Sequence, residues 1–366
     1  MSIRGIGHRL YSGEVSIDFV GRRRTWYTVS AIILVVSIGA LLFRGLNLGI
    51  EFKGGADFSI PSANCSIEQA RTTAETASGG QAIVTQTASH IVRVQTEPLT
   101  AAQSSELAGS LAQACGVEKD SIKVQVVGPT WGSEISKKAL QGLIAFLILV
   151  TIFLSIYFEW RMAAAALVAL AHDLVITVGI YALTGLEVTP ATVIGLLTIL
   201  GYSLYDTVVV FDKVKENTRG IAGQSVMTYS DAANLAVNQT LVRSINTSVV
   251  ALLPVVAIIV VGAGLLGAGT LLDLAVVLAV GMAAGAYSSI FIATVFLAQI
   301  KERQPDMKAL AARVAARRKQ AAVKSADASA DGAEGAATPV RSATSTRYDS
   351  ATRQQPKRQA RSRRKG

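Results

Sequence analysis

Six long apolar segments constrain this chain more than any other feature of its sequence. The hydrocarbon core of a bilayer is about 30 Å thick, so a helix needs roughly 20 apolar residues to cross it. The chain contains six such stretches and is therefore predicted to form six transmembrane helices. Their approximate ranges are 26–43, 139–158, 162–184, 189–211, 241–262 and 271–299. The first follows three arginines and has no small-residue cleavage site after it, so we interpret it as a retained helix and not a signal peptide.

Basic residues gather on one side of these segments, and this asymmetry predicts the orientation. Arginines occupy positions 22–24 before the first helix. Arg161 lies in the connection between the second and third helices, and Lys213, Lys215 and Arg219 follow the fourth helix. Because short cytoplasmic loops carry an excess of Lys and Arg, both termini are predicted to be cytoplasmic. The long segment between the first two helices is then extracytoplasmic.

The formal charge of +10 has a local origin. Residues 301–366 hold 17 of the 35 Lys and Arg side chains and 6 of the 25 acidic ones, so the rest of the chain is almost neutral. The three histidines have no metal-ligand spacing, and no phosphate-binding loop or nucleophile signature occurs. We therefore expect no metal, no cofactor and no enzymatic activity, and we expect any work to be driven from outside the chain.

The extracytoplasmic segment, residues 46–136, has the pattern of a small folded domain. Two helices are predicted to begin after Ser66 and Thr100, each of which is followed at the third position by a glutamine, as in a capping box. Four strands are predicted over 56–60, 82–87, 91–96 and 122–127. The order βαββαβ is that of a ferredoxin-like split unit. The predicted fold class is thus a six-helix membrane bundle with one small extracytoplasmic α+β domain.

The two ends of the chain are predicted to be cytoplasmic, over residues 1–25 and 300–366. From residue 320 onward the tail is mainly Ala, Ser, Thr, Gln, Arg and Lys, which bury too little apolar surface to fold, so we expect disorder there. Its clustered basic residues satisfy the orientation rule. Contact with anionic lipid or with ribosomal RNA is the alternative interpretation.

Three ionisable residues lie inside the predicted spans, where a charge costs about 2.5–3.5 kcal/mol on insertion scales. Asp206 lies toward the cytoplasmic end of the fourth helix, and Arg243 lies near the start of the fifth. These positions have comparable depth, so we expect the two side chains to meet across the bundle. Asp173 lies near the middle of the third helix beside His172, which faces elsewhere because successive helical residues point about 100° apart.

Each of these residues has a structural and a functional interpretation. Asp206 either forms a permanent ion pair that fixes helix register or binds and releases a proton during a cycle. Asp173 either belongs to a polar path or bonds to hydroxyls of a neighbouring helix. Small polar residues on the fourth and fifth helices either relay water and hydrogen bonds or simply join the helices. They are Ser203, Thr207, Asn238, Gln239, Thr240, Asn246, Thr247 and Ser248.

The two cysteines, Cys65 and Cys115, both fall in the segment placed outside the cytoplasm. In an oxidising compartment they can form a disulfide that links the ends of the two predicted helices. Two separate buried thiols are an equally simple interpretation.

Several motifs resemble those of the SecD/SecF family of protein-export membrane proteins, over residues 20–300. The segment at 48–55 resembles the signature G-I-D-F-K-G-G, and 128–134 resembles V-G-P-x-x-G-x-E. Residues 201–212 resemble G-Y-S-x-N-D-T-V-V-V-F-D, and 238–243 resemble Q-T-L-x-R. The motif positions are Gly49, Glu51, Phe52, Lys53, Gly54, Gly55, Gly201, Tyr202, Ser203, Thr207, Asp212, Gln239 and Thr240.

The resemblance implies a protein of the resistance-nodulation-division superfamily in a bacterial cytoplasmic membrane. It implies a SecD partner and action on the SecY/SecE/SecG channel, into which SecA feeds preproteins. Family members of the SecF type use the proton motive force to promote translocation, and the roles of Asp206 and Arg243 carry over by position. One proton crossing 100 mV releases about 2.3 kcal/mol, enough to bias a domain movement without ATP.

Two positions depart from the family pattern. Glu51 stands where the family has Asp, which keeps the charge, and Tyr205 stands where it has Asn, so the role of that amide does not carry over. Two alternative functions are a half-transporter for small molecules or lipids and a purely structural scaffold. Transporters of this superfamily usually have larger external domains and twelve helices in one chain, and the placement of Asp206 and Arg243 argues against a scaffold.

Overall fold

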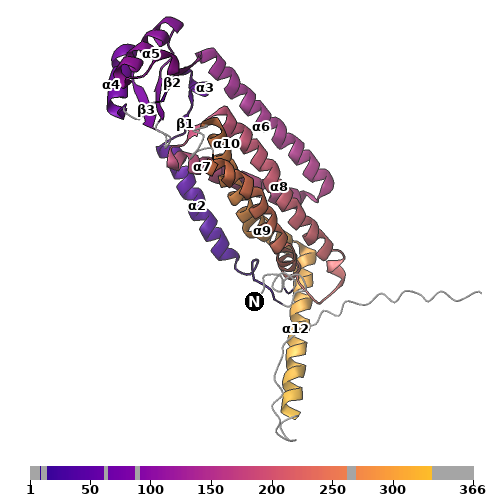
Figure 1. Ribbon diagram of the computed structural model, residues 1–366. Coiled ribbons are helices and arrows are strands. Elements are labelled where there is room, and N and C mark those ends of the chain that lie inside the picture. The colour runs from indigo at the N-terminus through magenta and orange to yellow at the C-terminus, as the bar shows by residue number, and fades with distance from the viewer. Residues whose placement is uncertain (1–8, 10–14, 62–64, 87–90, 262–268, 332–366) are drawn as a thin grey trace, which may run out of the picture.

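The fold was obtained as a computed structural model, which describes residue 9 and residues 15–61, 65–86, 91–261 and 269–331. The molecule is elongated, with a small α+β domain at one end and a helix bundle below it (Figure 1). The last helix, α12, projects from the other end of the bundle, near the N-terminal segment. The two ends of the bundle therefore carry quite different structures.

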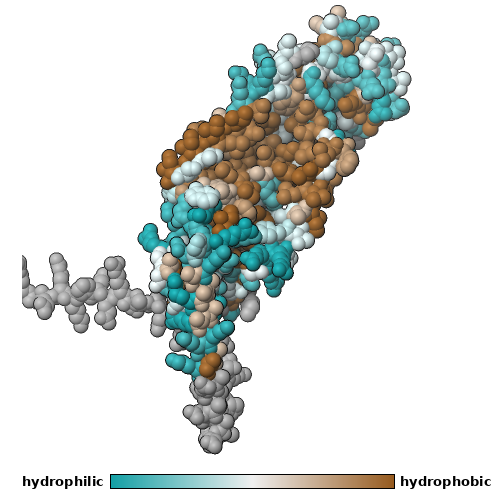
Figure 2. Space-filling model, turned by 180° about the vertical axis from the view of Figure 1, so that it is seen from behind, coloured by the Kyte–Doolittle hydropathy of each residue, from teal (hydrophilic) through white to brown (hydrophobic). Residues whose placement is uncertain are grey.

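Among the described residues, six helical stretches are long and apolar enough to cross a membrane. The last one is continuous but contains a π-helical turn, η4. The elements are α2 (Arg23–Phe43), α6 (Pro129–Tyr157), α7 (Trp160–Thr184), α8 (Pro190–Asn217), α9 (Tyr229–Val261), and α10 (Gly269–Ser288), η4 (Ser289–Ala293) and α11 (Thr294–Glu302) in series. Figure 2 shows the corresponding apolar band between two polar ends. The chain is thus a multi-pass membrane protein.

Helices α6 and α9 begin well before the apolar stretches that predict them, which start at residues 139 and 241. A helix satisfies its own backbone hydrogen bonds, so it continues into polar sequence when no breaker stops it. Helix α6 begins directly after Gly128, at Pro129. Proline is well suited to the first position of a helix, because the N–H that it lacks would have no helical partner there. Helix α6 consequently begins inside the segment that the sequence assigns to the external domain.

Close contact between α8 and α10 forms the centre of the bundle. A Cβ atom at Gly281 would lie 2.3 Å from Ile199, and one at Gly285 would lie 2.9 Å from the Cβ of Ser203. Small residues let transmembrane helices approach closely where apolar burial gives no net attraction. This approach brings the residues that follow Gly285 against the buried face of α8.

The α+β domain contains a four-stranded antiparallel sheet in the order β3-β4-β2-β5. Its elements are β2 (Gly55–Pro61), α4 (Ile67–Ser78), β3 (Ala82–Gln86), β4 (Ile91–Thr96), α5 (Ala101–Cys115), η1 (Lys119–Ser121) and β5 (Lys123–Val127). Phe58, Val92 and Val94 on the sheet and Leu107 and Leu111 on α5 are wholly buried between the sheet and the helices. The domain therefore has a hydrophobic core of its own.

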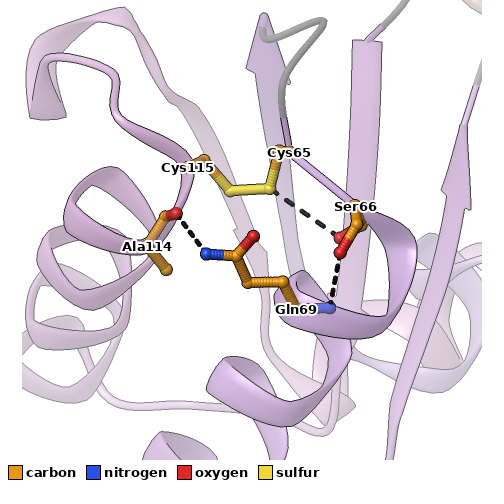
Figure 3. The surroundings of a disulfide bond; sticks show 5 residues. All are labelled: Cys65, Ser66, Gln69, Ala114 and Cys115. Carbon is orange, nitrogen blue, oxygen red and sulfur yellow. Dashed lines mark hydrogen bonds between the residues drawn. A yellow bond between two sulfur atoms is a disulfide. The ribbon is translucent and has the colours of Figure 1, made fainter.

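The helix caps of this domain differ from each other. At α5 the full capping box forms, with Thr100 and Gln103 bonding reciprocally. At α4 the Ser66 hydroxyl accepts from the Gln69 N–H, but the Gln69 side chain instead donates to the Ala114 carbonyl at 2.6 Å (Figure 3). Gln69 thus links the start of α4 to the end of α5. At the same place Cys65 and Cys115 are joined in a disulfide (Figure 3).

A second, two-stranded sheet connects the domain to the bundle. Strand β1 (Asn47–Leu48) pairs in parallel with β6 (Glu187–Val188), which lies between α7 and α8. The one-turn helix α3 (Ile50–Lys53) follows β1 and packs on the first turn of α6, where a Cβ atom at Gly132 would lie 2.6 Å from the Phe52 carbonyl oxygen. The sequence pattern did not predict these short elements, because two residues carry no periodicity.

Helix α12 spans Pro305–Asp331, so the prediction that the chain is disordered from residue 320 is wrong for residues 320–331. Alanine, lysine and arginine favour the helix, and its start is fixed by burial of Leu310 and Val314 against the bundle. The remaining residues of the predicted tail, 332–366, lie outside the described part of the chain.

Candidate functional site

Asp206 is the acidic side chain at the centre of the candidate site. It lies on α8, is 4% exposed, and accepts hydrogen bonds from two serines of other helices. Ser244 Oγ on α9 donates to Oδ1 at 2.7 Å, and Ser289 Oγ in the π-helical turn donates to Oδ2. π-Helical turns inside α-helices are frequent at functional sites. Here the turn places a hydroxyl against a carboxylate of another helix.

Asp173 lies on α7 and is completely buried. Ser203 Oγ on α8 donates a hydrogen bond to Oδ2, whereas Oδ1 has no hydrogen-bond partner and lies 3.5 Å from Nδ1 of His172. Because unpartnered buried polar atoms are rare in folded proteins, such an atom requires an explanation. Among the described residues, Nδ1 of His172 likewise has no hydrogen-bond partner.

Asp173 and His172 face different helices, as their spacing predicts. His172 Nε2 lies 3.0 Å from the Ser30 hydroxyl of α2, and the same hydroxyl lies 3.1 Å from the Tyr287 hydroxyl of α10. Hydroxyls and imidazoles both donate and accept protons, so this line of groups is suited to proton movement. It ends near Oδ1 of Asp173, whereas Ser203 bonds to Oδ2.

Ser203 connects the two aspartates through α8. Residues three apart on a helix lie on neighbouring surface positions, so Ser203 and Asp206 share one face of α8. Each is less than 5% exposed, and Thr207 beside them is also buried. The result is a polar layer inside the bundle, formed by residues of α7, α8, α9 and η4. We call Asp173, Ser203, Asp206, Ser244 and Ser289 the polar layer below.

Arg243 is not paired with Asp206, so the predicted ion pair is wrong. The Arg243 side chain is exposed, and its Nη2 donates to the Tyr205 hydroxyl at 3.3 Å. The reason is the helical rotation between neighbours: Ser244 faces α8 and Asp206, and Arg243, about 100° away, faces outward. Tyr205 likewise faces outward and is 53% exposed.

The polar residues before Arg243 also serve a different contact from the one expected. Asn238 accepts a hydrogen bond from the Ile17 N–H at 2.8 Å, and so holds the N-terminal segment against α9. Gln239 accepts from Asn217 at 3.0 Å, and Thr240 donates to the Ala236 carbonyl of its own helix. Asp212 is exposed. None of these four side chains contacts the polar layer.

The motif residues near the external domain form the turn into it. Gly49 precedes α3, and Gly54 follows it at φ 79°, a backbone conformation that favours glycine. A Cβ atom at Gly55 would lie 2.6 Å from the Thr96 carbonyl oxygen, so that strand contact requires glycine. Burial raises the pKa of the Glu51 carboxyl, and the nearby Glu187 carboxylate raises it further. One Glu51 oxygen is buried without a hydrogen-bond partner.

Arg93 on β4 joins the α+β domain to the bundle. It contacts Asp57 on β2 at 2.5 Å and Glu187 on β6 at 3.1 Å. Gln95 donates to the same two carboxylates, at 3.1 and 2.8 Å. Burial lowers the pKa of Arg93, but the charges of Asp57 and Glu187 hold it above its ordinary value. We call Asp57, Arg93, Gln95 and Glu187 the junction cluster.

Chemically, the polar layer is equipped to bind protons. No group of three or more His, Cys, Asp and Glu side chains suited to a metal ion occurs among the residues that the structure describes. The groups of the polar layer are carboxyls and hydroxyls, and the imidazole of His172 lies beside it; the common reaction of these groups is proton transfer.

Sequence reasoning found Asp173, Ser203 and Asp206 and missed Ser244, Ser289 and the Ser30–Tyr287 pair. For Ser289 a signal was present, because the Ser288-Ser289 pair interrupts an otherwise apolar segment. For Ser244 the prediction named the neighbouring Arg243 as the partner of Asp206. Which serine faces a carboxylate depends on the rotation of each helix about its axis, which composition does not specify.

Comparison with known proteins gives consistent matches. Residues 108–303 match the family described as protein export membrane protein SecD/SecF, C-terminal, and residues 39–56 match the SecD/SecF GG motif. Protein translocase subunit SecF of Streptomyces coelicolor is 54% identical and is aligned over 90% of this chain and 89% of its own. The Mycobacterium tuberculosis SecF is 45% identical, over 89% and 76% of the two chains.

Among solved structures, the crystal structure of SecDF from Thermus thermophilus, described as a translocon-associated membrane protein, matches with a TM-score of 0.71 at 29% identity. The match covers 79% of this chain and 39% of SecDF. This chain is thus similar to a part of that protein, and the remainder of SecDF has no counterpart here.

Proposed function

The chain belongs to the SecD/SecF family of protein-export membrane proteins, and on this premise we propose that it couples proton movement to preprotein translocation. A SecD protein is its partner, and the pair acts on preproteins that SecA has inserted into the SecY/SecE/SecG channel. The proton site is Asp206, with Asp173 as a second carboxylate on the path. The observation that supports this is the pair of serine donors on buried Asp206, with which no basic side chain of the described residues forms an ion pair.

Serine partners suit a carboxylate that changes its protonation state. A hydroxyl donates to an ionised carboxylate and can rotate to accept from a protonated one, so both states keep a hydrogen bond. An arginine partner would hold the carboxylate ionised. One proton crossing 100 mV releases about 2.3 kcal/mol, which is sufficient to shift a two-state equilibrium about 50-fold.

Arg243 is assigned to the surface that faces SecD. Its guanidinium lies on a spanning helix, is exposed, and has only the Tyr205 hydroxyl as a described side-chain partner. A charge facing hydrocarbon costs several kcal/mol, so a group from another chain should cover it. An acidic side chain on a SecD helix meets this requirement and would lie one residue away from the Ser244–Asp206 contact.

The proposed orientation places both termini in the cytoplasm and the α+β domain outside a bacterial cytoplasmic membrane. The basic residues at the α2 end of the bundle and the disulfide in the domain support it. The domain is assigned a ferredoxin-like architecture, supported by the element order β2-α4-β3-β4-α5-β5 in one antiparallel sheet. Movement of this domain would draw the emerging chain outward.

The test is preprotein export in cells whose only copy carries Asp206→Asn. Asparagine keeps the size and accepts from the same serines, but it cannot bind a proton as a carboxylate does. Export is expected to fall at least tenfold while membrane level and SecD association stay unchanged. The matched control is Glu216→Gln, which removes an exposed carboxylate outside the motifs from the same helix and should leave export intact. Normal export by the Asp206 variant would refute the assignment.

A further inference from the structure

The end of the bundle opposite the α+β domain contains a basic pocket of about 380 Å³. Its lining residues belong to the start of α2, the end of α11 and the start of α12. Figure 1 shows that α12 projects from this end of the bundle. Four cationic side chains line it: Arg23, Arg24, Arg303 and Lys308. The only carboxylate in its lining is Glu302.

This carboxylate does not neutralise the pocket. One Glu302 oxygen accepts from the Ser230 hydroxyl, and the other contacts Arg23 at 3.4 Å. Among the described residues, Arg24, Arg303 and Lys308 have no side-chain hydrogen bond or ion pair, and all three are exposed. The pocket therefore holds three uncompensated positive charges within a small volume.

The depth of the pocket in the membrane follows from the length of α2. Its 21 residues rise about 1.5 Å each, or about 31 Å in total, which matches the hydrocarbon thickness. Arg44 at its far end donates to the Leu183 carbonyl, at the level of the other membrane surface. The pocket around Arg23 and Arg24 thus lies where the phosphate groups of one leaflet lie.

Apolar surface begins immediately beyond the pocket. Val29, Ile32 and Val36 on α2 are exposed at hydrocarbon depth. Between this apolar surface and the basic residues of the pocket lie Tyr27 and Gln299, which are polar but uncharged. The Tyr27 hydroxyl donates a hydrogen bond to Gln299 at 2.7 Å. A ligand with an anionic head and apolar chains fits both surfaces, whereas a free anion uses only the first.

We propose that this pocket binds the phosphate headgroup of an anionic phospholipid. Guanidinium groups match phosphate oxygens with paired hydrogen bonds, and basic pockets at helix ends attract lipid phosphates. The bound lipid would fill the space between α2 and α11 and fix the first helix against the last. The site is independent of the polar layer, and its occupancy does not require proton movement.

Native mass spectrometry of the full-length chain tests the proposal. The chain is released from detergent after titration with phosphatidylglycerol, with phosphatidylcholine of the same acyl chains, or with inorganic phosphate. The wild-type chain is expected to retain one phosphatidylglycerol with at least tenfold higher affinity than phosphatidylcholine. The variant Arg24→Gln, Arg303→Gln, Lys308→Gln should lose this preference, because each basic residue contributes about a fivefold gain.

The matched control removes three charges at the opposite end: Arg71→Gln, Lys123→Gln, Lys137→Gln. It has the same net charge as the first variant and keeps the basic tail, so it should bind as the wild type does. A thermal unfolding curve for each variant excludes misfolding. Equal retention of the two lipids, or an undiminished preference in the first variant, would overturn the proposal. Phosphate that binds as tightly as phosphatidylglycerol and displaces it would overturn the lipid assignment in favour of a free anion.

Discussion

The α+β domain and the helix bundle keep their charged and polar groups in place by opposite means. In the domain, a disulfide joins α4 to α5, and Arg93 of β4 pairs with Asp57 of β2 and also with Glu187 at the bundle. In the bundle, Asp173 and Asp206 have serine partners, and the helices meet at glycines. Covalent and ionic links favour one arrangement, whereas hydroxyls rotate at little cost. Under the proposed function, the change of protonation would take place in the bundle, and the domain would keep its internal arrangement.

Removal of the disulfide is expected to have the largest effect on the stability of the domain. Replacing Cys65 and Cys115 by alanine removes a link across 50 residues of sequence, whose loop-closure entropy corresponds to about 4 kcal/mol of domain stability. Thermal unfolding of the purified chain, followed by circular dichroism, measures the loss. The wild-type protein in excess reductant should match the variant. If reductant leaves the unfolding temperature unchanged, the domain does not depend on its covalent link.

The junction cluster provides the second effect. Arg93→Met leaves Asp57 and Glu187 without a cation, and only the Gln95 amide and the Ser59 hydroxyl remain as side-chain donors among the described residues. It should cost roughly 3 kcal/mol, because removing the cation leaves two shielded carboxylates unpaired. Chemical denaturation of the purified chain measures this. Arg71→Met is the control: its pair with Glu68 is exposed and should contribute less than about 1 kcal/mol. Equal losses for the two variants would contradict the special role of the cluster.

A serine of the polar layer provides the third effect. Ser289→Ala leaves Asp206 with one donor and should cost about 2 kcal/mol, the usual range for hydrogen bonds to charged groups. Export should also fall several-fold. The neighbouring Ser288→Ala removes an equally buried hydroxyl that bonds only to the Gly285 carbonyl of its own helix, so it should have little effect on export. Similar export defects in both variants would point to general loosening of the helix.

The smallest effect is a pH dependence at the junction. Because burial raises the pKa of Glu51 in the folded chain, the protonated carboxyl stabilises the fold below about pH 4, and this stability is lost as the pH rises through the folded-state pKa. Glu51→Gln cannot ionise, so it should be more stable than the wild type at pH 8 and equal to it at pH 4. Denaturation at both pH values measures the difference. The control is Glu106→Gln, at an exposed position of α5, which should not become more stable than the wild type at pH 8.

Prediction from the sequence succeeded where the relevant physics is local. The six spans follow from segment hydrophobicity, and Thr100 and Gln103 form their capping box because both groups lie within one turn. Helix ends were less well predicted, as at Pro129 and Tyr229, because a helix needs no apolar side chains to continue into water. The helix over residues 320–331 was not predicted, because the segment has few large apolar side chains and therefore resembles a disordered tail.

The sequence by itself determined that the chain crosses a membrane six times, carries a small domain between its first two helices, and places Asp173 and Asp206 inside the bundle. Only the tertiary structure decided that Arg243 faces outward, that Ser244 and Ser289 bond to Asp206, and that Arg93 meets Glu187. The physical reason is that hydrophobicity and capping act within one segment. A contact between segments depends on the rotation and depth of each helix, and these are set by packing, such as that of Gly281 against Ile199.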